Sequence, residues 1–318
     1  MNLMNGTYYT QFIMNGFSMN SCLQSTVFLV FFLMYLITVS GNLVIIVIIH
    51  TSNNLKQTPM YFFLTHLSFI EICYTTAISP NFLDLILKGQ KIIPLTDCLI
   101  QLYLFLSLAS VESFLLTTMA YDRYLAICRP LHYQNIMSNK MCSNFVLSCW
   151  FAGLAIPSGL IILLCFIQYC APFTINHFFC DLSPLLATSC SSNIHHVKAF
   201  EHFAASCVLL SSIFVVLTSY IYIAKTILKI QSSHGRKKAF STCASHLTVV
   251  ILFFVPGILI YVTPLAHQSV TLNKWISLLY TEVTPLLNPF VYSLRNKDVQ
   301  LTLKKYLNFY FVGSVRRK

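Results

Sequence analysis

Three acidic residues, Glu71, Glu112 and Glu282, lie inside long apolar stretches of this 318-residue chain. An ionised carboxylate is costly in hydrocarbon, so each of these groups should face protein and hold a partner or a proton. A fourth acid, Asp122, directly precedes Arg123 where the apolar run that contains Glu112 ends. Acids inside apolar stretches can share a proton or bind a cation. The adjacent Asp122 and Arg123 can form a charge pair at a membrane boundary.

The sequence lacks the patterns that are typical of enzymes. It contains no Gly-rich phosphate loop, no His-Glu-x-x-His zinc motif and no Gly-x-Ser-x-Gly nucleophile elbow. Its Ser, His and Asp residues recur at no spacing that would place a nucleophile beside a base. We therefore expect that the protein is not an enzyme.

The composition indicates a membrane protein, because 56% of the residues are hydrophobic and only 9% are charged. Soluble domains carry about 25% charged residues. A helix needs about 20 mainly apolar residues to cross a bilayer. Seven stretches meet that length: 26–50, 59–83, 98–121, 142–164, 199–224, 239–263 and 272–294. The fold class predicted is an all-α membrane protein, a seven-transmembrane helix bundle.

The basic residues are concentrated on one side of these spans. Sixteen of the 20 lie in the tail and in the loops that follow the first, third and fifth stretches, near apolar ends. The other four are Lys88, Lys91, Lys198 and Lys274. The positive-inside rule then places the N-terminus outside the cell and the tail in the cytoplasm. Because the basic groups flank membrane spans, we expect no nucleic-acid partner.

The chain is expected to divide into an extracellular N-terminus (1–25), a seven-transmembrane domain (26–294) and a cytoplasmic tail (295–318). No cleavable signal peptide is apparent, so the first span is expected to act as an uncleaved signal. Asn5 begins an Asn-Gly-Thr glycosylation sequon on the predicted outer side. The residues after Arg295 are basic and amphipathic, which predicts a short helix on the inner leaflet.

Three sequence strings fall at predicted cytoplasmic helix ends: MAYDRYLAIC at 119–128, KAFSTCASHL at 238–247 and PLLNPFVYSLRN at 285–296. They closely resemble strings of the olfactory receptors, which are rhodopsin-like, seven-helix, G-protein-coupled receptors. The resemblance covers about 41–300. A transporter or channel is the alternative class, but it would predict internal repeats with paired broken helices, and no repeat is apparent.

The resemblance implies a two-state receptor that an odorant switches on. Span 6 would swing outward and Arg123 would face a stimulatory, olfactory-type G protein, raising cyclic AMP through adenylyl cyclase at the plasma membrane. The residues that the resemblance assigns to coupling and activation are Asp122, Arg123, Tyr124, Tyr220, Lys238, His246, Asn288, Pro289 and Tyr292.

Five cysteines lie at or within the predicted outer loops, namely Cys98 at the start of span 3 and Cys165, Cys170, Cys180 and Cys190 in the loop after span 4. An outside location permits disulfides, although sequence alone leaves their pairing open. The resemblance implies that Cys98 pairs with Cys180 and that Cys170 pairs with Cys190.

The resemblance also implies a ligand pocket in the outer half of the bundle. Its candidate residues are Phe105, Leu106, Ala109, Ser110, Ala205, Val208, Phe254, Ile258, Tyr261, Leu278, Thr281 and Glu282. They are mostly apolar, which suits a small, largely apolar volatile ligand.

Glu71 and Glu112 would face each other in the family's helix order. Glu112 lies eleven residues before Arg123, about 16 Å along a helix and near mid-membrane. Two facing acids either share a proton or bind a cation, here sodium; no other metal or cofactor is expected. Glu282 departs from the family's usual apolar residue. Its carboxyl would bond to a neighbour such as Thr281 or Ser110, extend the network of the other two acids, or face an amine odorant.

Overall fold

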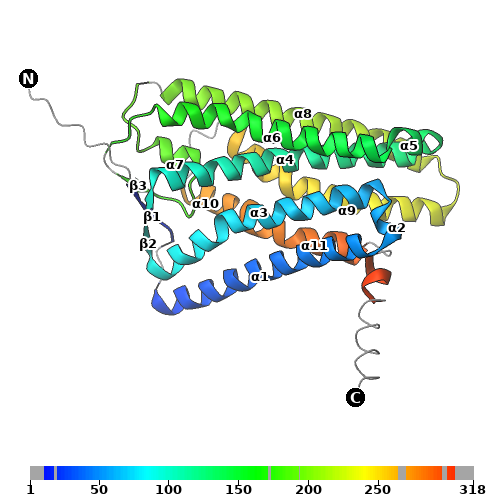
Figure 1. The fold of residues 1–318 in the computed structure, drawn as a ribbon, viewed down its shortest axis with the longest axis horizontal. Coiled ribbons are helices and arrows are strands. Elements are labelled where there is room, and N and C mark those ends of the chain that lie inside the picture. Colours follow the sequence, from blue (N-terminus) through cyan, green and yellow to red (C-terminus); the bar gives the residue numbers. More distant parts are fainter. Residues whose placement is uncertain are drawn as a thin grey trace, which may run out of the picture.

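The computed structural model describes residues 11–17, 20–170, 173–192, 194–263, 270–295 and 299–304. Long helices run side by side along one axis, and a small group of strands covers one end of them (Figure 1). We call this the strand end. The opposite end is called the Arg123 end, because Arg123 lies there, in the last turns of the third long helix.

Six described helices are long and apolar enough to cross a membrane. They are α1 (Ser21–Thr51), α3 (Pro59–Lys88), α4 (Leu95–Cys128), α6 (Asn139–Cys165), α8 (Ile194–Leu228) and α9 (Ser233–Tyr261). Each contains most of one span that the sequence predicts, and most extend beyond it by several residues. The seventh span is a continuous run of α10 (Val270–Leu278), the π-helix η1 (Leu279–Val283) and α11 (Thr284–Arg295). The predicted seven-helix bundle is confirmed.

The apolar residues serve two environments. Phe63, Leu67 and Phe105 are buried between helices, whereas Phe151 and Phe214 are 77% and 71% exposed. Exposed apolar surface of this extent is expected for helices that face lipid. Lipid tails are as apolar as these side chains, so the hydrophobic effect does little to hold the helices to one another. Close packing between the helices has to hold them together.

Small residues permit two of the closest approaches between helices. A Cβ atom on Gly153 of α6 would collide with Val111 of α4, and one on Gly41 of α1 would lie 3.2 Å from Pro289 of α11. These contacts bring the backbones together as small residues do in membrane bundles. The prolines Pro80, Pro157, Pro256 and Pro289 lie inside helices, where each removes one backbone donor.

The remaining helices are short and lie in the connections. They are α2 (Asn53–Lys56), α5 (Pro130–Ile136) and α7 (Leu182–Leu186). The Asp181 carboxylate accepts from the Leu182 N–H and begins α7, and Ser138 caps α6 through the Met141 N–H. Gly89 ends α3 with a φ of +74°, which residues with a Cβ rarely adopt.

The three-stranded sheet at the strand end was not predicted. Strand β1 (Gln11–Asn15) lies between β2 (Gln90–Pro94), its antiparallel neighbour, and β3 (Thr174–Ile175), its parallel neighbour. Strands this short give little periodic pattern, and the partners of β1 lie far away in sequence, with Ile13 opposite both Ile92 and Thr174. The sheet joins the N-terminal segment to two loops, and it buries Phe12 and Met14.

Both expected disulfides are present at the strand end. Cys98 is bonded to Cys180 and Cys170 to Cys190, with Cα–Cα distances of 5.3 and 5.6 Å. After the seventh span, residues 299–304 are helical and Val299 is buried. The position of this segment on a lipid surface, and the proposed division of the chain at 25 and 294, stay predictions.

Candidate functional site

A cavity lies among four helices and the π-helix. Residues from α4, α6, α8, α9 and η1 line it: Phe105, Leu106, Ala109, Ser110, Ile156, Pro157, Leu160, Phe200, Glu201, Ala204, Ala205, Val208, Leu209, Phe253, Gly257, Tyr261 and Tyr280. The cavity has a volume of about 80 Å³. This space accepts only a small molecule.

Seven of the twelve residues that the sequence suggested for a ligand pocket line this cavity, and the other five do not. The seven are Phe105, Leu106, Ala109, Ser110, Ala205, Val208 and Tyr261. On α9, Phe253 and Gly257 line the cavity in place of Phe254 and Ile258. This is a one-residue error, and one residue turns a helix by about 100°.

The other three expected residues, Leu278, Thr281 and Glu282, lie at or within η1 and do not line this cavity. A π-helical turn holds an extra residue, so side chains beyond it leave the positions that α-helical spacing predicts. Tyr280 lines the cavity from this segment. Glu282 instead faces α3, where its carboxylate accepts from the Ser79 hydroxyl at 3.0 Å.

The polar part of the cavity lies where α8 and α9 meet the loop after α6. Tyr261 lines the cavity and donates its hydroxyl to the Asp181 carboxylate at 3.3 Å. Burial raises the pKa of Asp181 to about 6, against the lowering effect of its bonds from Leu182 and Tyr261. Glu201 lies directly on the cavity wall and is partly buried.

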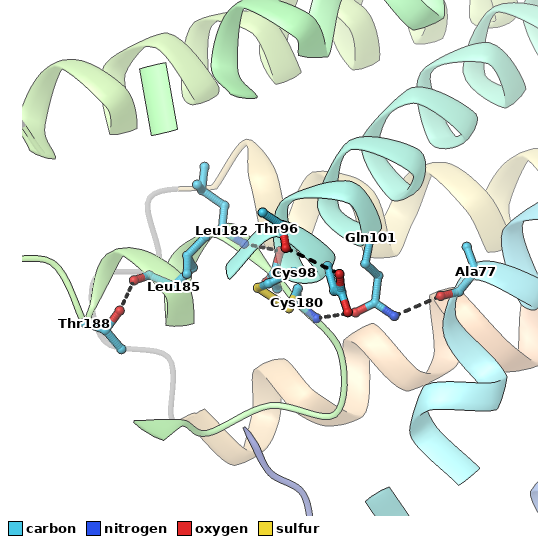
Figure 2. Close-up of a disulfide and its surroundings, with 10 residues drawn as sticks. Ala77, Thr96, Cys98, Gln101, Cys180, Leu182, Leu185 and Thr188 are labelled. Atoms are coloured by element: carbon cyan, nitrogen blue, oxygen red, sulfur yellow. Dashed lines mark hydrogen bonds between the residues drawn. A yellow bond between two sulfur atoms is a disulfide. The ribbon is translucent and has the colours of Figure 1, made fainter. Parts of the chain in front are cut away.

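Gln101 connects two helices to the loop near the disulfide (Figure 2). Its amide nitrogen donates to the Ala77 carbonyl of α3 at 2.8 Å, and its oxygen accepts from the Cys180 N–H at 3.0 Å. With the Cys98–Cys180 bond, these contacts hold the loop against α4. The loop segment that carries Asp181 is therefore fixed beside the cavity.

A buried lysine of the seventh span bonds to two other segments at the strand end. Lys274 donates to the Gly16 carbonyl at 2.9 Å and to the Asn176 side-chain oxygen at 2.6 Å. Its ammonium group also lies 5.3 Å from the centre of the Phe17 ring, within range of a cation–π contact. One side chain thus joins the N-terminal segment, a loop and α10.

The Arg123 end carries two polar contacts between elements. Asp122 is buried and accepts from the Tyr133 hydroxyl of α5 at 2.7 Å; burial and Asp122 together raise the pKa of Tyr133, so it stays a donor. The Tyr220 hydroxyl of α8 lies 2.7 Å from Nδ1 of His246 of α9. Arg123 is close enough to both groups to interact electrostatically.

Further inside the bundle, Glu71 and Glu112 face each other as expected and interact. Both are buried, with exposed fractions of 0% and 3%. The Asn288 amide donates to one oxygen of Glu71. Among the described residues, the other Glu71 oxygen, one Glu112 oxygen and the Asn288 oxygen have no hydrogen-bond partner.

Comparison with known proteins decides the family. Residues 31–309 match the family model described as olfactory receptor. The chain is 46% identical over 304 residues to human olfactory receptor 6F1, covering 95% of this chain and 97% of that one. It is 44% identical to mouse olfactory receptor 5G26, covering 99% and 98% of the two chains. The chain belongs to the olfactory receptor family.

As an olfactory receptor, the protein is a multi-pass membrane receptor of the G-protein-coupled class and not an enzyme. The sequence strings that indicated the family lie at the Arg123 end. Asn288 and Pro289 of this olfactory receptor lie in α11. Tyr124 packs against Tyr121 and Tyr222, with ring centres 6.1 and 5.9 Å away. Asn5 and the side chains of Lys238 and Tyr292 lie outside the described residues.

Sequence analysis missed four polar residues that shape the receptor's strand end: Gln101, His177, Glu201 and Lys274. Each had a detectable feature, since a polar residue near an apolar span is costly without a partner. The loop and N-terminal partners of Gln101 and Lys274, however, lie in segments whose placement the sequence does not reveal. Glu201 in particular begins an expected span and reads as a boundary residue.

Proposed function

We propose that this receptor binds a small, mostly apolar odorant in the cavity between α4, α6, α8, α9 and η1. The observation that carries the proposal is the lining itself, which is built chiefly of aliphatic and aromatic side chains with few polar groups. Such a pocket is typical of small-molecule sites. Its limited volume suits a small molecule, and small apolar molecules are volatile.

The bound odorant would act through α9. Gly257 lines the cavity and follows Pro256, where the helix lacks one backbone hydrogen bond. A ligand that contacts this segment better in one arrangement of α9 shifts the receptor toward that arrangement. The far end of α9 holds His246, so an outward swing there would break its bond to Tyr220 and expose Arg123.

The partner in this proposal is a stimulatory, olfactory-type G protein, which raises cyclic AMP. The receptor would lie in the plasma membrane with its strand end and N-terminus outside. Two features support this orientation: most basic residues lie toward the Arg123 end, and the disulfides lie at the strand end, as an oxidising exterior permits.

A cyclic AMP assay against a chemically diverse panel of small odorants tests the function, using wild type and Ala109→Trp. The added indole would fill the cavity and should abolish the response to every active odorant. Leu104→Trp is the matched control, because Leu104 lies on the same helix and is 39% exposed on the bundle surface. An Ala109→Trp receptor with normal surface level and normal responses would place the ligand elsewhere.

A further inference from the structure

Among the residues that line the cavity, Glu201 is the single acidic one. It lies in α8, two turns before Val208, on the part of the helix nearest the strand end. The other polar groups of the lining are neutral: Ser110, Tyr261 and Tyr280. Ser110 donates its hydroxyl to the Leu106 carbonyl of its own helix at 2.8 Å. The carboxyl is therefore the strongest polar feature that a ligand in this cavity meets.

A second acid increases the negative charge beside this wall. Asp181 receives the Tyr261 hydroxyl at 3.3 Å and lies close enough to Glu201 for the two carboxyls to repel each other. The nearest cation that acts on Glu201 is Lys198, one turn earlier on α8 and exposed. In the part of the chain that the structure describes, no ion pair or hydrogen bond to Glu201 is formed.

A partly buried carboxylate without a partner is costly, and a ligand cation that reaches it lowers that cost. Primary aliphatic amines have a pKa close to that of lysine, about 10.4, so they are protonated at neutral pH. Their ammonium group donates three hydrogen bonds, and their alkyl chain suits the apolar remainder of the lining. The cavity thus offers one acidic position, which an ammonium group can pair with, and one apolar compartment of limited length.

We propose that Glu201 receives the ammonium group of a small aliphatic amine and is the residue that makes this receptor select amines over neutral odorants. The inference rests on the proposed use of the cavity as the odorant site. Asp181 and Tyr261 act behind Glu201: the Tyr261–Asp181 bond holds the loop acid near the same end of the cavity. Glu282 has no part in this selection, because its carboxylate is turned to Ser79 of α3.

The test uses three probes of equal length, pentylamine, pentan-1-ol and pentanal, on the full-length receptor and on Glu201→Gln. Cyclic AMP is measured together with surface level. We expect wild type to respond to pentylamine at lower concentration than to the other two. For Glu201→Gln, the pentylamine concentration that gives a half-maximal response should rise about 10-fold or more. The responses to pentan-1-ol and pentanal should remain. Glu282→Gln is the matched control and should keep all three responses.

A second readout separates this inference from the proposed signalling function. Pentylamine should raise the unfolding temperature of the purified wild-type receptor, and the rise should be absent in Glu201→Gln. A Glu201-dependent rise without any cyclic AMP response supports the inference and rejects the proposed coupling. Equal losses for all three probes, or a pentylamine response unchanged in Glu201→Gln, overturns the inference even when neutral odorants signal normally.

Discussion

The side-chain oxygen of Gln101 accepts the backbone N–H of Cys180 at 3.0 Å, three residues along α4 from the cysteine to which Cys180 is bonded. The loop after α6 is therefore held to α4 at one point by a covalent bond and a hydrogen bond. The same side chain donates to the Ala77 carbonyl of α3. Gln101 is 4% exposed, so neither bond is replaced by water when the side chain is removed.

Gln101→Leu should lower the free energy of unfolding by about 1–3 kcal/mol, because it leaves the buried Cys180 N–H and Ala77 carbonyl unsatisfied. Thermal unfolding of the detergent-purified receptor measures the loss. Gln101→Glu is the matched variant: it keeps the acceptor for Cys180 but turns a second carboxyl oxygen toward the Ala77 carbonyl oxygen at a buried site, so its loss should be at least as large. A leucine variant as stable as wild type would show that the two bonds contribute nothing net.

Gln101 also shows what the sequence does and does not predict. The seven spans, both disulfides and most of the α4 side of the cavity follow from apolar length, charge placement and family resemblance. A polar residue in a span indicates that it has a hydrogen-bond partner. The loop partner of Gln101, however, is 79 residues away in sequence. Distant pairings of this kind depend on how the loop packs, which local sequence patterns do not determine.

The position of Glu282 has a different physical origin. The family resemblance suggested the pocket residues of the seventh span, and η1 changes the helical spacing over Leu279–Val283. The carboxylate consequently bonds to Ser79, a partner that was not among those expected. The strand pairing of β1 was missed for a related reason, because its stability comes from distant partners rather than from its own five residues.

Acidification should destabilise the receptor through His177. This loop residue is 2% exposed and stacks on Phe178 with ring centres 4.8 Å apart. Burial, and secondarily the charge of Lys274, lowers the pKa of His177 to about 3. Since its pKa when unfolded is near 6.5, the unfolded chain binds the extra proton between pH 6.5 and about 3, and stability falls as pH falls through that window.

At pH 5 this single group should cost about 2 kcal/mol relative to neutral pH. His177→Phe cannot take up the proton and keeps the ring stacking, so its unfolding temperature should fall less between pH 7 and pH 5. Asp181 acts in the opposite direction, because its pKa is raised to about 6, and it contributes equally to both receptors. Parallel pH dependence of wild type and His177→Phe would contradict the prediction.

Arg123→Ala should abolish the cyclic AMP response while leaving the receptor folded. One guanidinium nitrogen of Arg123 is buried and has no hydrogen-bond partner among the described residues. Its removal breaks no hydrogen bond of that nitrogen, but it takes away the positive charge that acts on buried Asp122, so the free energy of unfolding should fall by about 1–3 kcal/mol. Surface labelling and cyclic AMP are measured together. Arg129→Ala is the matched control, because Arg129 is exposed at the end of α4. Normal signalling by Arg123→Ala at normal surface level would remove Arg123 from the coupling role.

The buried pair of Glu71 and Glu112 is proposed to hold one cation, either a sodium ion or a shared proton. Two facing carboxylates repel each other, and a single positive charge between them removes that repulsion. The unpaired oxygens of both acids and of Asn288 lie in one region of the bundle, and hard cations take oxygen ligands of this kind. Either occupant would tie α3, α4 and α11 together at mid-membrane.

Unfolding temperatures measured in sodium chloride and in choline chloride, each at about 0.15 M, distinguish the two occupants. If sodium binds, stability rises with its concentration, by about 1.4 kcal/mol for each tenfold increase above the dissociation constant, and Glu112→Gln loses this dependence. If a proton is shared, the salts are equivalent and Glu112→Gln is nearly as stable as wild type, because the amide donates to Glu71 as the protonated acid does. Glu282→Gln controls for loss of a buried acid elsewhere. A receptor that ignores sodium and is nevertheless strongly destabilised by Glu112→Gln would hold neither occupant, and the proposal would be wrong.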